Sequence, residues 1–297
     1  MTKGSVAPNE LRVEANGLSH RVLEWRSTSG RHDRASTVML VHGFMDAAGT
    51  WEEVAPALSA RGHRVLAPDM RGFGEAPRAP RGSYYHFVDY VADLAEILGA
   101  LAPGPVALVG HSMGGTIATL YAGAYPENVV RLANLEGLGP PDNRWEVGPT
   151  RVRRWIEDVR EAKRRGEPKP FGREDACDRL AASHPAVSPD VLARKLSHLA
   201  HQVEDDGFVW RFDPLHRTTS PVPFFAKLFV EFAKAVRCPV LFVSGGTEGF
   251  HVVDEEERLA AFERLRRATL EGAGHMLHWT RPTELGELLV DFLHDPT

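Results

Sequence analysis

One serine lies in a sequence context that is typical of a catalytic nucleophile. Residues 110–114, GHSMG, match the pattern G-x-S-x-G with Ser112 at its centre. A continuous apolar run precedes this pentapeptide, and a helical pattern begins at residue 113. A strand–turn–helix of this kind holds a serine in a strained turn with its oxygen exposed beside a helix N-terminus. The bare pattern is common by chance, so the context carries the prediction that Ser112 is a nucleophile.

A serine hydroxyl is a poor nucleophile unless a general base accepts its proton. His275 is the best candidate for this base, because it follows a short predicted strand and lies on the Gly-rich loop EGAGH. His278 lies three residues further along and is expected to be a surface residue or a residue at the entry of a helix. His111 adjoins the nucleophile, but its side chain should point away from Ser112 and serve in packing.

Two glutamates compete for the role of the acid that orients His275, and Asp254 is a third candidate whose commoner role is to cap a helix. Glu136 ends an apolar run, and Glu248 lies in the loop GGTEG after the next such run. Both fall between Ser112 and His275 in the chain, at the C-terminal ends of predicted strands, where a doubly wound sheet builds its site. A carboxylate directly after an apolar strand is expensive to bury without a partner, and a histidine N–H is a fitting one. The cost of burial therefore favours Glu136 as the acid, and Glu248 stays an alternative.

A serine nucleophile that attacks a carbonyl also needs two backbone N–H groups aimed at the developing negative charge. Met113, directly after the nucleophile, is expected to supply one of them. The loop after the first buried strand, with the sequence HGFM at 42–45, is expected to supply the other from Phe44. The side chains of Phe44 and Met113 would then line the site.

The elements that must position these residues alternate between strands and helices. Hydrophobic periodicity predicts strands at 11–16, 20–26, 37–43, 63–69, 106–110, 129–136, 239–246 and 268–271, and helices at 50–61, 84–101, 113–124, 254–266 and 283–294. Asn16-Gly17 marks a hairpin between the first two strands. The alternation predicts right-handed βαβ units on a mostly parallel sheet, an α/β fold.

The alternation stops between residues 139 and 237. Helical patterns occur there at 151–165, after Ser188 and at 222–236, without a clear buried strand. We therefore expect a core formed by 1–138 and 238–297 and a helical cap formed by 139–237. Aromatic residues of this cap are candidates for lining a substrate site, although holding helices together is their commoner role; they are Trp155, Phe224, Phe225 and Phe229.

Composition limits the class of protein. Hydrophobic residues make up 43% and charged residues 25% of the chain, as in soluble globular proteins. A formal net charge of -5 gives no reason to expect nucleic acid or an anionic membrane as a partner. Cys177 and Cys238 form no CxxC pair and fit a reducing compartment, so a cytoplasmic location is expected. No histidine or cysteine spacing suggests a metal, and we expect neither metal nor cofactor.

Four segments in combination resemble the signatures of α/β-hydrolases with a helical cap. They are HGFMDAAGTW, PDMRGFG, GHSMGG and GAGHMLHWTRP, and they cover the predicted core at both ends of the chain. The resemblance implies an eight-stranded, mostly parallel sheet flanked by helices, with a helical cap insertion. It also implies a Ser–His–acid triad, an oxyanion hole at Phe44 and Met113, and no metal.

The segments NLEGLGPP, DPLH and SPVPF resemble a poorly characterised bacterial branch of these enzymes. That branch is similar to haloalkane dehalogenases in placing a glutamate after the strand that precedes the cap, which supports Glu136. The commoner pattern has an aspartate after the next strand, where this sequence shows Thr247-Glu248, so Glu248 stays an alternative. Dehalogenases and epoxide hydrolases carry an aspartate in place of Ser112, so their alkyl-enzyme chemistry is not expected.

The predicted activity is hydrolysis of a small to medium apolar carboxylic ester through an acyl-enzyme, with a small-molecule substrate as the partner. C–C bond hydrolysis or acyl transfer by the same triad is an alternative. A ligand-binding or signalling protein with slow turnover is an alternative of another class. The sequence leaves the oligomeric state open.

Overall fold

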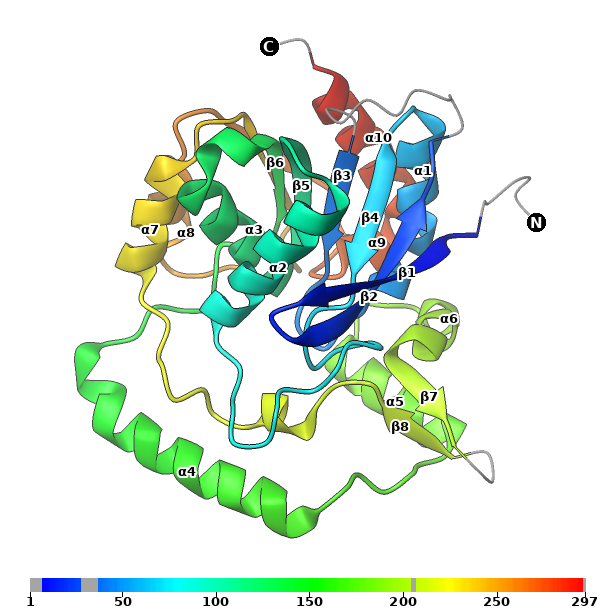
Figure 1. Cartoon of the computed structure of the whole chain (residues 1–297), viewed down its shortest axis with the longest axis vertical. Coiled ribbons are helices and arrows are strands. Elements are labelled where there is room, and N and C mark those ends of the chain that lie inside the picture. The colour runs from blue at the N-terminus through cyan, green and yellow to red at the C-terminus, as the bar shows by residue number, and fades with distance from the viewer. Residues whose placement is uncertain (1–6, 28–36, 204–206, 296–297) are drawn as a thin grey trace.

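One eight-stranded sheet runs through the computed structural model, which describes residues 7–27, 37–203 and 207–295 (Figure 1). The strand order is β1-β2-β4-β3-β5-β6-β9-β10. The first two strand pairs in this order, β1–β2 and β2–β4, are antiparallel, and the others are parallel. The mostly parallel sheet predicted from the sequence is therefore confirmed. The strands are β1 (Asn9–Ala15), β2 (Leu18–Trp25), β3 (Thr37–Val41), β4 (Arg64–Pro68), β5 (Val106–His111), β6 (Val129–Leu135), β9 (Val240–Ser244) and β10 (Leu265–Thr269).

Helices cover both faces of this sheet. One face packs against α1 (Ala55–Ala60), α9 (Leu277–Thr280) and α10 (Pro282–His294). The other face packs against α2 (Phe87–Leu101), α3 (Met113–Ala124), α7 (Ala226–Ala235) and α8 (Glu255–Ala260). Both faces are therefore buried, which explains why the central strands read as continuous apolar runs instead of alternating ones.

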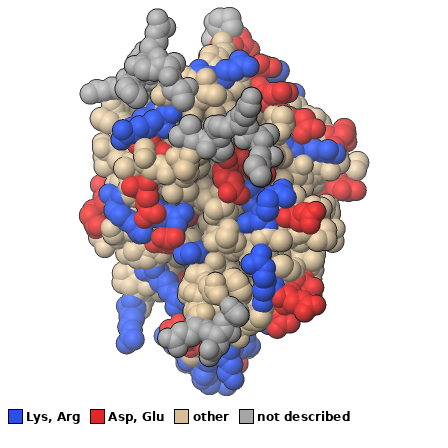
Figure 2. Space-filling view, turned by 90° about the vertical axis from the view of Figure 1, so that its right-hand side faces the viewer, with Lys and Arg blue, Asp and Glu red and all other residues tan. Residues whose placement is uncertain are grey.

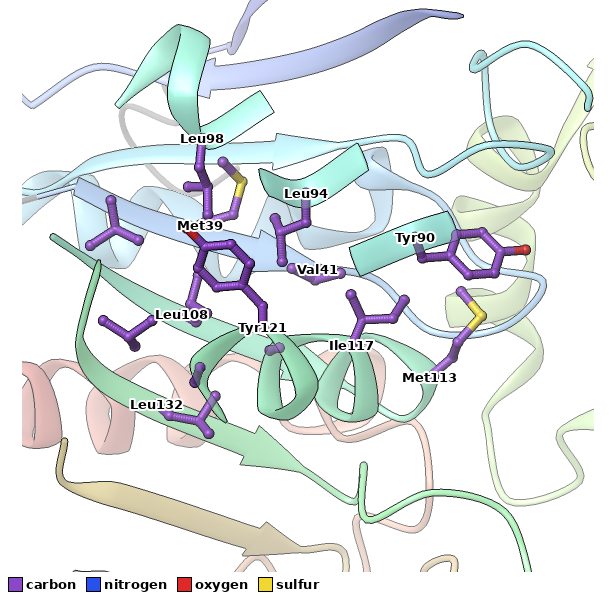
Figure 3. Packing of buried hydrophobic residues seen from close by; sticks show 14 of the residues in the cluster. Met39, Val41, Tyr90, Leu94, Leu98, Leu108, Met113, Ile117, Tyr121 and Leu132 are labelled. Carbon is purple, nitrogen blue, oxygen red and sulfur yellow. The ribbon is translucent and has the colours of Figure 1, made fainter. Parts of the chain in front are cut away.

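The central strand β3 shows how the core is divided. All five of its residues are buried. Met39 and Val41 point to the side of α2 and α3, whereas Val38 and Leu40 point to the side of α1 and α10. Figure 3 shows Met39 and Val41 close to Leu94 of α2, with α3 below them. The strand carries apolar side chains on both faces because each face supports its own cluster.

Local sequence signals were accurate where the chain turns tightly. The turn at Asn16-Gly17 joins β1 to β2, and both residues have positive φ, +51° and +74°. This conformation is the one that favours Asn-Gly in two-residue hairpins. The predicted helix 50–61 was wrong in part. The chain forms a 3₁₀ helix, η2 (Ala48–Glu53), and then the short α1, and the Thr50 hydroxyl donates to the Ala47 carbonyl instead of capping a helix.

The end of the predicted helix 254–266 was also wrong. The helix α8 ends at Ala260, and β10 begins at Leu265, three residues before the predicted strand. Parallel pairing of β10 with β9 takes these residues into the sheet. Tertiary hydrogen bonding therefore overrides the helical pattern of this segment.

The segment between β6 and α7 contains more structure than the sequence predicted. It forms α4 (Gly148–Arg165), α5 (Arg173–Ser183), α6 (Pro189–Leu199), the hairpin β7 (Ala200–Gln202) and β8 (Phe208–Trp210), and a 3₁₀ turn η5 (Pro214–Arg217). The helix α5 and the hairpin were not predicted. In Figure 1 α4 runs along the lower edge of the molecule, away from the sheet. By contrast, α7 packs closely on α3, where Gly123 leaves room for the Phe232 backbone. The division into core and cap at 139–237 stays a prediction.

Charges of both signs share the surface. Figure 2 shows Lys and Arg interspersed with Asp and Glu over most of the face it presents. On β1, for example, Arg12 pairs with Glu10 and Glu75 at 3.0 and 3.2 Å. Within the described residues, no helix is long and apolar enough to cross a membrane.

A buried lysine ties α6 to the core. Lys195 is completely buried, and its ammonium group lies 2.9 Å from Glu53, 3.1 Å from Glu52 and 3.2 Å from the Thr50 carbonyl. These acceptors offset the cost of burying the charge. His198 of α6 adds a contact of 2.9 Å to Glu52. Burial alone would raise the pKa of Glu52, but the hydrogen bonds and charges of His198 and Lys195 outweigh it and lower the pKa to about 2.

Glu52→Gln is expected to lower the free energy of unfolding at neutral pH. It should also make this free energy depend less on pH in the acidic range. Because the pKa of Glu52 is lower in the folded state than its ordinary value of 4.5, its contribution is present above that value and is lost as pH falls towards about 2. Urea unfolding should therefore show a gap between wild type and variant at pH 7 that narrows at about pH 3. Glu263→Gln, which breaks an exposed pair with Arg237, is the control and should change little. A gap that does not depend on pH would contradict this role of Glu52.

Candidate active site

Ser112 occupies a sharp turn between β5 and α3. Its φ and ψ are +50° and -118°, a conformation that non-glycine residues rarely adopt. The turn is possible because two glycines lack side chains: a Cβ on Gly110 would lie 2.3 Å from the Gly114 carbonyl oxygen, and one on Gly114 would lie 2.1 Å from the Val41 carbonyl oxygen. The strand and the helix therefore approach closely, and the serine is presented at the helix N-terminus.

Three side chains from different parts of the sequence form a hydrogen-bonded chain. Ser112 Oγ lies 3.0 Å from His275 Nε2, and His275 Nδ1 lies 2.8 Å from Glu136 Oε2. Ser112 follows β5, Glu136 follows β6, and His275 follows β10. The C-terminal ends of three parallel strands thus bring together a hydroxyl, an imidazole and a carboxylate in the order that nucleophilic catalysis by serine requires.

The Glu136 carboxylate is buried, and both of its oxygens are hydrogen-bonded. Its side chain is inaccessible to solvent, and its backbone has a positive φ of +50°. Besides the contact to His275, Oε1 accepts a hydrogen bond from the Gly245 N–H at 2.6 Å, and Oε2 accepts one from the Phe250 N–H at 2.8 Å. Three donors therefore compensate the burial of this group, which then presents one oxygen to His275 Nδ1.

Glu248, the alternative acid, lies on the loop that surrounds Glu136. Its residue is exposed, whereas the backbone N–H groups of Gly245 and Phe250 in the same loop bind the Glu136 carboxylate. The structure therefore brings Glu136, and not Glu248, to His275. The supporting role of these N–H groups was not visible in the sequence, because backbone donors carry no residue signature.

The two residues predicted to bind a substrate oxygen through their backbone N–H groups are Met113 and Phe44. Met113 is the first residue of α3, so its N–H has no acceptor within the helix. Phe44 lies inside a turn that the Asp46 N–H closes on the Gly43 carbonyl. His42 holds this turn from below, because its Nδ1 donates to the Gly43 carbonyl at 2.8 Å and its Nε2 accepts from the Met70 N–H at 3.0 Å. Phe44 and Met113 line the same cavity as Ser112.

A cavity of about 950 Å³ is lined in part by Ser112. Its walls are mostly apolar and come from α2, α3, α7 and the segment before α7. Of the aromatic residues proposed from the sequence, Phe224, Phe225 and Phe229 line it. Trp155 is not among the lining residues that the structure describes. Its ring contacts the ring of Tyr84, a lining residue, at a centroid distance of 5.7 Å.

The cavity wall also contains polar groups that carried no functional signal in the sequence. His216, from the DPLH segment, lies in the wall with its ring stacked on Phe73 at 4.0 Å. Its Nε2 lies 2.8 Å from the Tyr90 hydroxyl. Burial lowers the pKa of His216 to about 4, so the imidazole is neutral near pH 7 and the wall carries no charge at this point.

A second buried polar cluster lies behind the hydrogen-bonded chain. It consists of Asp46, His111 and His278. The expectation that His278 lies on the surface was wrong. It lies in the first turn of α9, in keeping with the alternative that it enters a helix, but it is completely buried and contacts Asp46 at 2.9 Å. The three side chains offer potential metal-ligating atoms within 4.8 Å of one another. Each carboxylate oxygen of Asp46 already has a hydrogen-bond partner, the Ala47 N–H for one and His278 Nε2 for the other.

The comparison with protein families decides the classification of the chain. A sequence model described as the alpha/beta hydrolase fold matches residues 36–282. The chain belongs to this family. The relatives of this α/β hydrolase include epoxide hydrolase A from Mycobacterium tuberculosis, which is 26% identical over 97% of this chain and 98% of its own. They also include the esterase Rv0045c from the same organism, which is 29% identical over 95% of this chain and 88% of its own. Among solved structures, a thioesterase domain from the curacin biosynthetic pathway superimposes with a TM-score of 0.82 at 24% identity, over 96% of this chain and all of that one, which supports the fold alone.

Glu136→Gln is expected to lower the turnover of an activated aryl ester by about 10³–10⁴-fold, because the imidazole of His275 loses the charge that orients it. Circular dichroism should show a folded protein. Glu248→Gln is the matched control, since it makes the same change on an exposed side chain, and it should cost less than about tenfold. A larger loss in the control than in Glu136→Gln would reverse the assignment of the acid.

Proposed function

We propose that this α/β hydrolase is a carboxylic-ester hydrolase that forms an acyl-enzyme on Ser112. The observation that carries the proposal is the hydrogen-bonded chain from Ser112 Oγ through His275 to Glu136, with distances of 3.0 and 2.8 Å. Ser112, at one end of this series of hydrogen bonds, lines an apolar cavity that suits a small-molecule substrate. A hydroxyl with a base and an orienting acid is the arrangement for attack on a carbonyl.

In the first half of the reaction, His275 Nε2 accepts the proton of Ser112 while Oγ attacks the ester carbonyl carbon. The N–H groups of Phe44 and Met113 donate to the oxygen that becomes negatively charged. Glu136 stabilises the imidazolium and keeps its proton on Nδ1 directed at the carboxylate. His275 then donates the Nε2 proton to the departing alcohol, and the acyl group stays on Ser112.

In the second half, a water molecule takes the place of the alcohol. His275 accepts a proton from this water as it attacks the acyl carbonyl, and the same two N–H groups again bind the negative oxygen. Collapse of this intermediate releases the carboxylic acid, and the proton returns from His275 to Ser112.

The nucleophile itself separates this proposal from epoxide opening, the activity in the name of one relative. An epoxide opened by Ser112 would leave an alkyl ether on the protein. An ether has no carbonyl for an activated water to attack, so the enzyme would not be regenerated. An acyl group on Ser112, by contrast, is an ester that the His275-activated water can hydrolyse.

Ser112→Ala is expected to lower ester hydrolysis by about 10³-fold or more while the fold survives, because only binding and the N–H groups of the oxyanion hole would still assist the reaction. An organophosphonate should label wild type at Ser112 and leave the variant unlabelled, which mass spectrometry of the peptides would detect. Labelling of another serine, or activity of the variant close to that of wild type, would refute the role of Ser112.

Rapid-mixing kinetics with p-nitrophenyl butyrate distinguish ester hydrolysis from slow turnover by a ligand-binding protein. A burst of nitrophenol followed by steady turnover is expected for an esterase in which release of the acyl group is slower than its formation. A single stoichiometric burst with no further turnover would favour the ligand-binding alternative. Faster nitrophenol release on adding an alcohol, with an ester as product, would favour acyl transfer.

The extent of the cavity along α3 predicts how the length of the acyl chain affects hydrolysis. Leu120 is half-buried in the wall, about 12 Å along α3 from Ser112. Leu120→Trp should therefore obstruct long acyl chains and leave short ones unaffected. We expect the ratio of kcat/KM for p-nitrophenyl octanoate to that for the acetate to fall by about tenfold or more, since each buried methylene contributes about 0.8 kcal/mol. Val253→Trp, at a fully exposed residue outside the cavity lining, should leave the ratio unchanged. An unchanged ratio in Leu120→Trp would place the acyl chain elsewhere.

A further inference from the structure

The ring of His111 contacts the loop of His275 and the loop of Phe44, and His111 is the chain neighbour of Ser112. His111 directly precedes Ser112, and its Nε2 donates to the backbone carbonyl oxygen of His275 at 2.7 Å. On its other edge, Nδ1 lies against Gly43 so closely that a Cβ on this glycine would come within 2.7 Å of it. Gly43 precedes Phe44. One buried ring therefore lies between the loop of the base and the loop of an oxyanion donor. It fixes the distance between these two loops.

His278 supports this ring from behind. The two imidazoles lie 4.5 Å apart between centroids, and His278 is in turn covered by Trp51 at the same distance. His278 Nε2 lies 2.9 Å from the carboxylate of Asp46, and the other oxygen of Asp46 accepts the Ala47 N–H at 2.8 Å. Asp46 belongs to the loop of Phe44, and the ring of His111 lies against Gly43 of the same loop. The first and the last side chain of the cluster therefore both contact the Phe44 loop.

Burial fixes the protonation of the cluster. Burial lowers the pKa of His111 well below its usual value and also lowers the pKa of His278. Burial alone would raise the pKa of Asp46, but the hydrogen bond from His278 and the neighbouring imidazoles hold it well below its usual range. The cluster therefore contains a carboxylate and two neutral imidazoles near pH 7. Each imidazole has one N–H, and the acceptors place it on Nε2, towards the His275 carbonyl and towards Asp46.

We propose that Asp46, His278 and His111 form a positioning cluster that holds the His275 loop in register with the Phe44 loop. None of the three hydrogen-bonds to Ser112 Oγ or to a ring nitrogen of His275, although the ring of His111 packs 4.8 Å from the ring of His275. Their effect is on geometry: the cluster keeps the base and the oxyanion donor at a fixed separation while Ser112 lies between them. A displacement of about 1 Å in such a site lowers the rate by up to about a hundredfold. This inference rests on the proposed function only in assuming that His275 activates Ser112.

The test compares two buried histidines that each contact a backbone carbonyl. His111→Leu removes the bond to His275, and His20→Leu removes a bond of 3.0 Å to the carbonyl of Asp69 on the antiparallel side of the sheet. Both changes remove a completely or almost completely buried imidazole, so both should lower the unfolding temperature. Only His111→Leu should lower kcat for p-nitrophenyl butyrate, by about ten- to a hundredfold, with KM within about threefold of wild type. His278→Leu should behave like His111→Leu.

A conservative variant separates positioning from bulk packing. His111→Gln keeps a side-chain N–H that can donate to the His275 carbonyl, so it should recover most of the kcat that His111→Leu loses. If His111→Leu does not fold, His111→Gln and Asp46→Asn decide the question, with a kcat near wild type for the first and at least about a tenfold loss for the second. Wild-type kcat in folded His111→Leu, or an equal loss in His20→Leu, would overturn the proposal.

The rate of organophosphonate labelling keeps this test independent of the substrate. Labelling needs Ser112 to be activated by His275 but does not need an ester. If wild type hydrolyses no ester yet is labelled at Ser112, the proposed function fails while the cluster can still be tested. In that case His111→Leu should be labelled about ten- to a hundredfold more slowly than His20→Leu. Equal labelling rates would overturn the positioning role alone.

Discussion

A carboxylate buried at the end of a β-strand must be met by hydrogen-bond donors, and the candidate active site is organised around this requirement. Glu136 is inaccessible to solvent and accepts hydrogen bonds from Gly245, Phe250 and His275. Leaving such a group without partners would cost far more than most single contacts contribute. The bonds that satisfy the carboxylate therefore also fold the loop after β9 over it and fix the ring of His275.

A second constraint is strain at two neighbouring strand ends. Ser112 and Glu136 both have a φ of +50°, at the ends of the adjacent parallel strands β5 and β6. Non-glycine residues in unfavourable backbone conformations cost about 1–3 kcal/mol each and persist only where the surroundings hold them. Here the Ser112 N–H donates to the Leu135 carbonyl at 2.9 Å, and the Glu136 N–H donates to the Val243 carbonyl at 3.2 Å. Inter-strand hydrogen bonding continues through the strained residues and offsets part of this cost.

The surroundings of the site divide into an apolar side and a polar side. The cavity above Ser112 is mostly apolar, which suits desolvation of an ester. Below and behind it, buried polar groups such as Asp46 and His278 connect loops that are more than two hundred residues apart in sequence. Lys195 makes a similar connection between α6 and η2. Directional hydrogen bonds thus hold the loops in place, and the residues of the cavity wall take no part in these bonds between loops.

The sequence by itself determined the features that depend on neighbouring residues. The hairpin at Asn16-Gly17, the buried strands and the glycine-flanked turn of Ser112 follow from local conformational preferences and hydrophobic patterning. The preference for Glu136 over Glu248 came from the cost of burying a carboxylate next to an apolar strand. The tertiary structure alone decided that His278 is buried, that Trp155 lies outside the cavity lining, and that residues 50–61 divide into two short helices. These outcomes depend on which distant segments supply the neighbours and hydrogen-bond partners of a residue, and local sequence does not encode such long-range contacts.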